Sequence, residues 1–296
     1  MTSTRLNEEL GIETFFKCEN LQKVGAFKAR GATNAVMSLG AAAAARGVVT
    51  HSSGNHGAAL AYAAGARGIP CVVVMPDDAP AIKVAAVRGY GAEIVLCERT
   101  QREAACRKEI DKRGMTLIHP YEDPGVIAGQ GTVALELLDQ VEGLDLVLAP
   151  VGGGGLLSGT ALTVSSLAPK IPVWGAEPKA VDDAHRSLES GTLQPAPENP
   201  QSWGDGLLTG LGKKPFAILN SCGVRVVTVE EQAMLEAAWT LMRRLKLVVE
   251  PSGATVLAAL RRQSGAWRGK RVGAILSGGN TDFAWLSSPL LQAGRS

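Results

Sequence analysis

Short runs of β-branched and other apolar residues alternate along this chain with longer segments in which apolar residues recur at helical spacing. Such an alternation is typical of parallel sheets flanked by helices, so the predicted fold class is α/β. Strands are expected at 47–50, 72–75, 93–96, 116–119, 146–150, 173–176, 224–229 and 272–276. Helices are expected at about 57–66, 81–90, 101–113, 127–141, 156–167, 230–245 and 253–263.

The predicted strands fall into two series, which indicates two lobes. The first series lies between about residues 35 and 125, and the second follows it. Two open parallel sheets that meet at a cleft are the simplest arrangement for this order. The segment 191–223 has no regular pattern, and an irregular segment of this length in a compact domain is usually functional.

Composition and charge narrow the classes of protein to consider. The 296 residues are 46% hydrophobic with 35 glycines, which is typical of a globular α/β enzyme. A formal net charge of +2, with basic residues scattered among acidic ones, disfavours nucleic acid as a partner. The five cysteines form no CxxC pair, and an odd number argues against a disulfide framework. With no bilayer-spanning run and no signal-peptide pattern, we expect a cytoplasmic protein without a membrane partner.

The stretch 15–32, FFKCENLQKVGAFKARGA, contains the first candidate catalytic residue, Lys28. Burial lowers the pKa of a lysine and leaves its amine free to form an imine with an aldehyde cofactor. An isolated lysine between Phe27 and Ala29 is more often an ordinary solvated residue near the start of a helix. The catalytic interpretation therefore depends on four segments further along the chain.

Two of these segments follow predicted strands and open predicted helices. In HSSGNHG, 51–57, hydroxyl, amide and backbone N–H donors could bind a carboxylate, although helix capping by Ser and Asn is an equal alternative. In VGGGG, 151–155, four glycines let the backbone surround an oxyanion at the positive end of a helix. We therefore predict a phosphate site at VGGGG, which has neither the P-loop nor the dinucleotide-binding spacing.

The other two segments end predicted strands. LSGGN, 276–280, places the hydroxyl of Ser277 where it could meet a ligand, although by itself the segment is a common strand-terminating turn. AEPKAVDD, 176–183, carries Glu177 and Asp183, whose carboxylates together with loop carbonyls suit Mg²⁺ or Ca²⁺. Helix capping by the two aspartates at 182 and 183 is a comparable alternative.

Taken in order, KCEN, AFKARGA, SSGNHG, GGGG, AEP with a following Asp, and SGGN resemble the fold-type II pyridoxal-phosphate enzymes. The resemblance covers nearly the whole chain and is strongest to the serine/threonine dehydratase and serine racemase branch. It implies a fold similar to the β subunit of tryptophan synthase, with a cofactor cleft between two lobes. Residues 1–34 and 126–296 would form a large cofactor-binding domain, and residues 35–125 a small mobile domain.

The resemblance also implies roles for individual residues toward pyridoxal 5′-phosphate. Lys28 would form the imine, Asn55 would bind the 3′-hydroxyl, and Ser277 would bind the pyridine nitrogen. The phosphate would be held by Gly152, Gly153, Gly154 and Gly155. A neutral serine does not keep the ring nitrogen protonated, so the resemblance favours β-elimination over transamination.

The implied reaction is removal of water and ammonia from a β-hydroxy amino acid such as L-serine or L-threonine, giving a 2-oxo acid. Lys28 would remove the Cα proton as general base. Ser53 would act on the opposite face, so racemisation is a plausible second activity. The substrate carboxylate would be bound by Ser52, Ser53, Gly54, Asn55 and His56.

Several features depart from the family pattern or leave choices open. Relatives usually have some 20 to 30 further residues before KCEN, so the stability and dimer packing of this chain are expected to differ from theirs. After SGGN the chain has no room for a regulatory domain, so end-product feedback at such a domain is not expected. Glu177, Asp183 and the carbonyl of Val181 match the divalent-cation site of racemase-like relatives. A homodimer is implied by the resemblance alone.

The loop SWGDG, 202–206, bears on the choice of substrate. Gly204 replaces a common alanine and would enlarge the substrate pocket, and Trp203 would either line the pocket or pack in the core. A bulkier or acidic substrate such as phenylserine or 3-hydroxyaspartate therefore stays open beside serine. The non-enzyme alternative is an idle protein that binds the cofactor or an amino acid, but a decayed site would be expected to lose the lysine or the serine first, and Lys28, Ser53 and Ser277 are all present.

Overall fold

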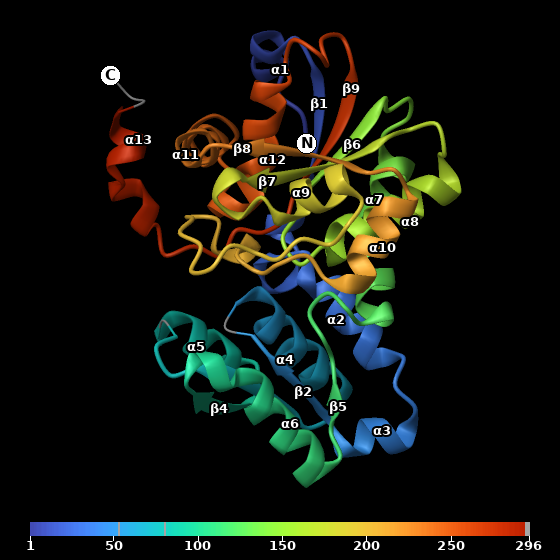
Figure 1. The fold of residues 1–296 in the computed structure, drawn as a ribbon, viewed down its shortest axis with the longest axis vertical. Helices are drawn as coiled ribbons and strands as arrows, with labels where there is room; N and C mark the ends of the chain where they lie inside the picture. Colours follow the sequence, from blue (N-terminus) through green and yellow to red (C-terminus); the bar gives the residue numbers. More distant parts are fainter. Residues whose placement is uncertain (53, 80, 294–296) are drawn as a thin grey trace. The chain divides into compact units, whose positions relative to one another are not determined.

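The computed structural model describes residues 1–52, 54–79 and 81–293 (Figure 1). The chain divides into two compact units. Unit 1 consists of Met1–Phe27 and Gly131–Ser296, and unit 2 consists of Lys28–Gln130. Each unit has its own parallel sheet, so the two are considered separately.

The sheet of unit 1 has five parallel strands. Their spatial order is β1 (Glu13–Cys18), β9 (Arg271–Leu276), β6 (Leu146–Pro150), β7 (Val173–Pro178) and β8 (Arg225–Val229). Leu148 on the central strand lies opposite both Ala274 and Trp174. Because all strands are parallel, their carboxyl ends share one edge, where loops that follow the strands can form a site.

Both faces of this sheet are buried, because successive residues of a strand point to opposite sides. Leu148 and Val227 belong to one apolar cluster, while their neighbours Val147 and Val226 belong to the other. The first cluster includes side chains of α1 (Thr4–Leu10), α11 (Glu231–Thr240), α12 (Pro251–Arg262) and α13 (Pro289–Ala293). The second includes side chains of α7 (Pro124–Gln140), α8 (Gly155–Leu167), α9 (Asp183–Ser190) and α10 (Lys213–Ser221). Burial of each such Leu or Val side chain stabilises the folded state by about 1.5–3 kcal/mol relative to leaving it exposed.

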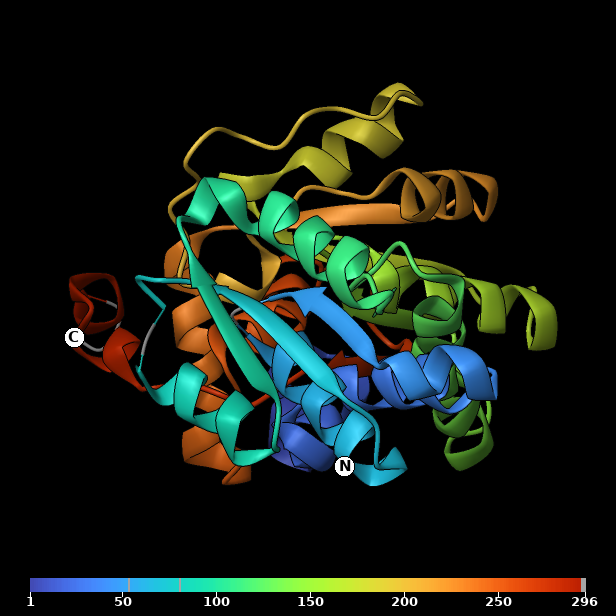
Figure 2. The same cartoon turned by 90° about the horizontal axis from the view of Figure 1, so that it is seen from below.

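The sheet of unit 2 has four parallel strands with helices on both faces. Their order is β4 (Glu93–Cys97), β3 (Cys71–Pro76), β2 (Val48–His51) and β5 (Thr116–Leu117). Val72 and Val74 pack with Cys106 of α6, whereas Val73 lies beside Gly57 of α4. Figure 2 shows α6 on one side of these strands and α4 with α5 on the other. The helices of the unit are α2 (Lys28–Met37), α3 (Ala41–Arg46), α4 (Asn55–Arg67), α5 (Ala81–Gly89) and α6 (Arg102–Arg113).

Within unit 2, α2 and the first half of α7 cross at a close contact between glycines. A Cβ atom at Gly31 would lie 2.4 Å from Gln130 Nε2 and 2.6 Å from the carbonyl oxygen of Val126. A Cβ atom at Gly129 would lie 2.7 Å from the Cα atom of Gly31. The backbone N–H of Gly31 also donates a hydrogen bond to Gln130 Oε1 at 3.2 Å. This crossing fixes the first turn of α2, the helix that begins at Lys28.

The α/β fold and all the predicted strands are confirmed, and several elements correct the prediction. The sequence analysis missed α1 and β1, and it treated 191–223 as irregular although α10 lies inside it. Pro215 in the first turn of α10 hides a helical pattern, because proline is tolerated only at that end of a helix. The helix predicted at 230–245 ends as an α-helix at Thr240 and continues as a π-helical turn, Leu241–Leu245.

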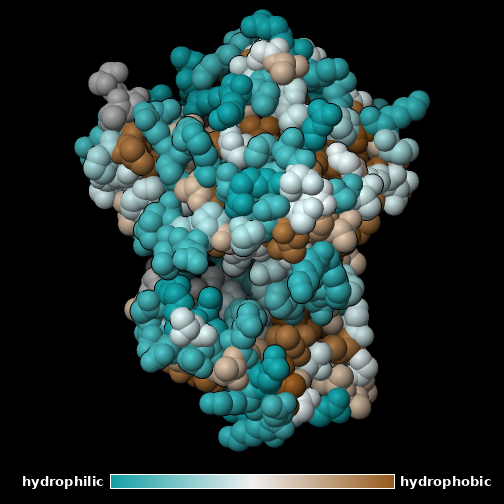
Figure 3. All heavy atoms as spheres, viewed as in Figure 1, coloured by the Kyte–Doolittle hydropathy of each residue, from teal (hydrophilic) through white to brown (hydrophobic). Residues whose placement is uncertain are grey.

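The predicted domain boundaries, 34/35 and 125/126, lie inside α2 and α7. The two units instead divide at 27/28 and 130/131, so the assignment of a small mobile domain stays a prediction. In the part of the chain that the structure describes, no helix has the length and apolar character needed to cross a membrane. On the face shown in Figure 3, hydrophilic residues predominate and hydrophobic ones are divided among small patches.

Candidate active site

Lys28 is the first residue of α2, and its amine is desolvated by burial. Its Nζ donates a hydrogen bond to the carbonyl oxygen of Pro120 at 2.8 Å. The residue as a whole is half-buried, but burial of the amine lowers its pKa to about 8. A substantial fraction of the amine is therefore neutral near pH 8, as a nucleophile or a general base must be.

The segment after β5 holds the carbonyl that meets Lys28. The ring of His56 faces the carbonyl oxygen of Ile118 at 3.0 Å, so its Nε2 is the protonated nitrogen. The Nδ1 atom of His119 accepts hydrogen bonds from the backbone N–H groups of Glu122 at 3.1 Å and Tyr121 at 3.4 Å. Two imidazole rings thus hold the backbone on either side of Pro120.

Histidine rings surround this segment and are uncharged at neutral pH. Burial, with a smaller contribution from the charge of Lys28, lowers the pKa of His56 to about 3. Burial, with smaller contributions from the nearby His51 and Lys28, lowers the pKa of His119 to about 4. His119 makes edge-on contacts with the rings of His51 and Tyr121, with centroids 5.5 Å and 4.6 Å away.

The segment SSGNHG connects β2 to α4 in unit 2. Ser52 donates its backbone N–H to the Val74 carbonyl at 3.1 Å, and its Oγ accepts from the N–H of Gly54 at 3.3 Å. Gly54 is the N-cap of α4, and Asn55 is the first residue of that helix. The segment therefore presents a helix N-terminus, where backbone N–H groups favour an anion. Ser53, the residue predicted to act on the opposite face of the cofactor, lies outside the described residues.

The four glycines 152–155 connect β6 to α8 in unit 1, and all four are buried. A Cβ atom at Gly152 would lie 2.8 Å from the Cα atom of Leu207. Gly154 has a φ of +91°, and a Cβ atom there would lie 2.6 Å from both Leu211 Cδ1 and Pro215 Cβ. Side chains are thus sterically excluded at both Gly152 and Gly154. The loop leads directly into the N-terminus of α8.

Ser277 directly follows β9 in unit 1, and 4% of it is exposed. Its carbonyl oxygen accepts a hydrogen bond from the backbone N–H of Phe27 at 3.0 Å. The next residue, Gly278, forms an isolated antiparallel bridge with Ala26. The SGGN turn is therefore bonded to the two residues that directly precede Lys28 in the chain.

Glu177 of β7 and Asp183, the first residue of α9, are buried carboxylates in unit 1. The two oxygens of Glu177 accept backbone N–H groups of Ala184 at 3.0 Å and His185 at 2.9 Å. Asp183 Oδ2 accepts the N–H of Leu211 at 2.7 Å. Burial raises the pKa of Glu177 to about 9 despite these hydrogen bonds, and it also raises the pKa of Asp183. The two carboxylates are thus held where a cation would stabilise their charged forms.

Val181 lies in the short turn between these carboxylates, and its side chain is buried. Across the described residues, no three His, Cys, Asp or Glu side chains gather as a metal-binding group. A cation at this position would therefore depend on backbone carbonyls as well as on the two carboxylates.

The loop around Gly204 gives one clear outcome. Trp203 is 38% exposed, so the alternative that it packs in the core is wrong. The backbone N–H of Gly204 donates to Ser202 Oγ at 3.0 Å. A Cβ atom at Gly204 would lie 3.3 Å from Pro178 Cγ and 3.4 Å from Met234 Sδ, so an alanine would fit only tightly.

Comparison with known proteins places the chain in a family. Residues 1–278 match the sequence profile of the pyridoxal-phosphate dependent enzymes. The chain belongs to this family. It is 48% identical to the serine racemase of Dictyostelium discoideum over 295 residues, which cover 98% of this chain and 91% of the relative. It is 49% identical to the beta-hydroxyaspartate dehydratase of Paracoccus denitrificans over 284 residues, or 95% of this chain and 90% of the relative.

Solved structures agree with this family membership. The crystal structure of the serine racemase from Dictyostelium discoideum matches with a TM-score of 0.91 and 48% identity, covering 96% of this chain and 92% of that one. The crystal structure of the T.th. threonine deaminase matches with a TM-score of 0.91 and 45% identity, again covering 96% and 92%. The protein is therefore a fold-type II pyridoxal-phosphate dependent enzyme, in the dehydratase and racemase branch that the motifs predicted.

The residues present fit the cofactor of this family, unit by unit. In unit 2, burial keeps the Lys28 amine partly neutral, as attachment to an aldehyde requires. In unit 1, the loop 152–155 is a cradle in which a Cβ atom at Gly152 or Gly154 would clash with neighbouring residues. Such a loop at a helix N-terminus suits a phosphate.

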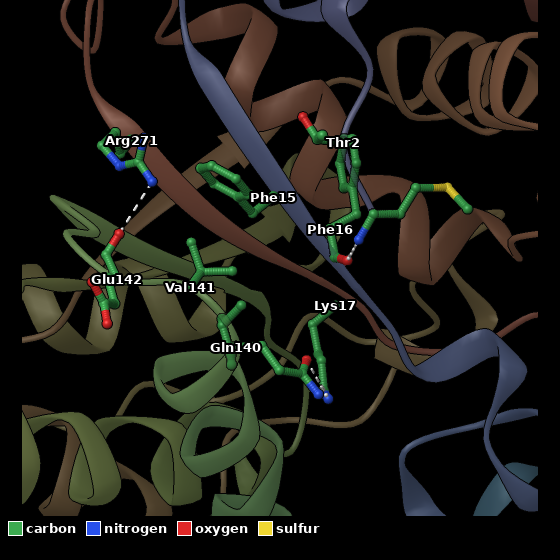
Figure 4. Close-up of a pocket in the computed structure, with 10 residues that line it drawn as sticks. Thr2, Phe15, Phe16, Lys17, Gln140, Val141, Glu142 and Arg271 are labelled. Carbon is green, nitrogen blue, oxygen red and sulfur yellow. Dashed lines mark hydrogen bonds between the residues drawn. The ribbon is translucent and has the colours of Figure 1, made fainter.

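A separate cavity of about 360 Å³ lies in unit 1 and contains none of the predicted site residues. Figure 4 shows Phe15, Val141 and Arg271 around it, with Arg271 bonded to the carbonyl of Glu142. Its two cationic side chains have acidic partners, since Lys17 pairs with Glu136 at 2.6 Å and Arg271 with Glu13 at 2.5 Å. The cavity is thus distinct from the enzyme's candidate active site.

Sequence reasoning missed three residues near Lys28, namely His119, Pro120 and Tyr121. The segment was interpreted only as the end of a strand predicted at 116–119, although β5 ends at Leu117. One signal could have found it, because three of the chain's four histidines lie at or shortly after the carboxyl ends of the neighbouring strands β2 and β5. The carboxyl ends of parallel strands meet at one edge, so these histidines had to lie close together.

Proposed function

We propose that this enzyme is an ammonia-lyase that converts a β-hydroxy amino acid, such as L-serine or L-threonine, to a 2-oxo acid and ammonia. The observation that carries the proposal is the Lys28 amine, whose pKa burial lowers to about 8 and which is hydrogen-bonded to the Pro120 carbonyl. A lysine in this state can release a proton and take one up at neutral pH. Relatives named as dehydratase, ammonia-lyase and threonine deaminase support the reaction class.

We propose that the enzyme binds pyridoxal phosphate. Lys28 and Asn55 would bind its aldehyde carbon and its 3′-hydroxyl, and Ser277 its ring nitrogen. The glycines 152–155 would hold its phosphate through backbone N–H groups, which the cradle geometry supports. When bound, the cofactor supplies an electron sink that acidifies the Cα–H bond of an amino acid.

The chain's own groups then perform the proton transfers and the binding. The neutral amine of Lys28 takes the Cα proton, and loss of the β-hydroxyl as water follows. Water returns when the product breaks down to the 2-oxo acid and ammonia, so the net reaction is balanced. The substrate carboxylate would lie on Ser52, Ser53, Gly54 and Asn55 at the start of α4, where backbone N–H groups favour an anion. His56 would contribute its backbone N–H, because its ring faces the Ile118 carbonyl.

Racemisation of serine is the second candidate function, favoured by the 48% identity to a serine racemase. It would need a second proton donor on the opposite face, the role proposed for Ser53. An acidic substrate such as 3-hydroxyaspartate is a further candidate, because relatives at 49% and 45% identity are named for it. Gly204 is the residue at which we propose that substrate size is selected.

A divalent cation, Mg²⁺ or Ca²⁺, is proposed at Glu177, Asp183 and the carbonyl of Val181. Two buried carboxylates with raised pKa values, one on β7 and one at the start of α9, support it, because a cation would favour their charged forms. We also propose a homodimer, on family likeness alone. A cytoplasmic location is supported by the five cysteines, which are all free thiols.

The function is tested by 2-oxo acid release from L-serine, L-threonine and 3-hydroxyaspartate by the purified protein, with and without added pyridoxal phosphate. Cofactor-dependent release from at least one substrate is the expected result. Absence of release from all three, with a bound cofactor visible in the absorbance spectrum, would contradict the lyase proposal.

The racemase candidate needs its own assay. We expect Ser53→Ala to abolish conversion of L-serine to D-serine and to retain most 2-oxo acid release. Equal loss of both activities would contradict separate roles for Ser53 and Lys28.

A further inference from the structure

We propose that His119 is a positioning residue for Lys28, because its imidazole fixes the turn after β5 that presents the Pro120 carbonyl to the lysine amine. The inference deepens the proposed function and rests on it only for the catalytic consequence. All the groups involved belong to unit 2, and neither His119 nor Pro120 has a role in the proposed function.

The first step of the argument is the hydrogen bonding of the turn. His119 Nδ1 accepts the N–H groups of Tyr121 and Glu122, the two residues that follow Pro120. Proline fixes its own φ and has no N–H, so the orientation of its carbonyl depends on the next peptide unit. That unit contains the Tyr121 N–H, which is bonded to His119. The imidazole therefore restrains the carbonyl that accepts from Lys28 at 2.8 Å.

The second step is the restraint on the ring itself. His119 is held edge-on between the rings of His51 and Tyr121, with centroid distances of 5.5 Å and 4.6 Å. Such edge-to-face contacts contribute about 0.5–1.5 kcal/mol each beyond burial. On the other side of Pro120, the ring of His56 is bonded to the Ile118 carbonyl. Backbone groups at both ends of the segment 118–122 are thus fixed by side chains.

The third step concerns charge. The ionisable groups near His119 are His51, Lys28, Glu103 and Asp123. Asp123 also accepts the backbone N–H of Val126 at 3.0 Å at the start of α7, so it is engaged there. With the His119 ring neutral, Nδ1 keeps the lone pair that both N–H groups need. A charged ring would lose this lone pair and repel the Lys28 ammonium group.

The consequence for chemistry is the direction of the Lys28 amine. A neutral amine that donates one N–H to a fixed carbonyl has its lone pair restricted to the remaining directions. The neutral amine is also the state in which Lys28 acts as a base in the proposed reaction. The Pro120 carbonyl thereby keeps the base in place while it takes and returns a proton.

The test uses two variants that separate the functions of the ring. His119→Asn retains an acceptor at the position of Nδ1 but removes the ring, and His119→Phe retains the ring contacts but removes the acceptor. The pKa of Lys28 is measured in the cofactor-free protein from the pH dependence of acylation by an amine-selective reagent, followed on the Lys28 peptide by mass spectrometry. Thermal melting checks that each variant folds.

We expect the Lys28 pKa of His119→Asn to stay near the wild-type value, and that of His119→Phe to fall by about one unit, because the buried ammonium group loses a fixed carbonyl acceptor that stabilises its charge. An unchanged or raised pKa in His119→Phe, or equal shifts in both variants, overturns the proposal. Should His119→Phe not fold, His119→Leu takes its place with the same criteria. Because this measurement uses neither cofactor nor substrate, its result does not depend on whether the lyase activity exists.

A kinetic measurement then tests the catalytic consequence. In the lyase assay we expect a fall in kcat of at least about 10-fold for His119→Phe, with KM changed less than kcat, and recovery of most of it in His119→Asn. A variant that changes KM but keeps the wild-type kcat would contradict positioning of the base.

Discussion

The candidate functional residues of unit 1 and those of unit 2 are built in opposite ways. Unit 1 contributes a backbone loop without side chains, since a Cβ atom at Gly152 or Gly154 would clash with neighbouring atoms. Unit 2 offers one side chain, Lys28, whose amine is held by a carbonyl that imidazole rings fix. We expect the glycine loop of unit 1 to lose its function when a side-chain atom is added to it. We expect the Lys28 arrangement of unit 2 to lose its function when a hydrogen-bond acceptor or the amine is removed.

The largest expected effect comes from removing the amine in unit 2. Lys28→Ala should lower turnover at least about 10³-fold, because both the attachment of the cofactor and the general base are lost. Lys17→Ala is the matched control, since Lys17 bonds to Glu136 and Gln140 of α7 and to no predicted site residue. Steady-state kinetics with added cofactor measure the difference. Turnover by Lys28→Ala at the wild-type rate would contradict the account.

Adding a methyl group to the glycine loop of unit 1 should have the next largest effect. Gly154→Ala combines a φ of +91° with clashes against Leu211 and Pro215, so we expect a loss of about 2–4 kcal/mol in the free energy of unfolding and weaker cofactor retention. Gly191→Ala is the control, because Gly191 has a φ of +67° but no atom within 4 Å of its Cβ position. It should lose only about 1 kcal/mol and retain the cofactor.

A glycine-to-alanine substitution in unit 2 tests whether the contact between α2 and α7 is as closely packed as the glycine loop of unit 1. Gly31→Ala should lower the free energy of unfolding by about 1–3 kcal/mol, because its Cβ would lie 2.6 Å from the Val126 carbonyl at the α2–α7 crossing. Gly89→Ala, where nothing lies within 4 Å, should be neutral or stabilising by up to about 1 kcal/mol. Denaturant titrations of the two variants measure this, and equal effects would show that the crossing is loosely packed.

The smallest expected effect is the response of unit 1 to a divalent cation. Burial raises the pKa of Glu177 to about 9, so the folded state binds an extra proton from about pH 4.5 upward. The contribution of the Glu177 proton to the free energy of unfolding is fully present below about pH 4.5 and is lost as the pH rises through 9. At pH 8, Mg²⁺ or Ca²⁺ in tenfold excess over its dissociation constant should add about 1 kcal/mol.

The control for the cation is Asp183→Asn, which removes one carboxylate and keeps an acceptor for the Leu211 N–H. The variant should show no stabilisation by the cation in thermal melting. A wild-type protein whose melting temperature is the same with the cation and with a chelator would contradict the cation proposal.

The difference between the units also explains what the sequence could reveal. All strands of the two sheets except β1, and the four-glycine loop, could be predicted, because β-branched runs and consecutive glycines are local signals. The Lys28–Pro120 contact joins residues 92 positions apart and depends on a backbone carbonyl, which any residue type can supply. No spacing in the sequence encodes such a contact, and the imidazoles that support it were obscured by the prediction of a strand through His119.

The central claim is that Lys28 carries the cofactor, and the most direct test is borohydride reduction of the cofactor-loaded protein followed by mass mapping of its peptides. The account predicts a pyridoxyl-phosphate group attached to Lys28. Attachment to another residue such as Lys17 or Lys23, or no covalent attachment despite bound cofactor, would contradict it.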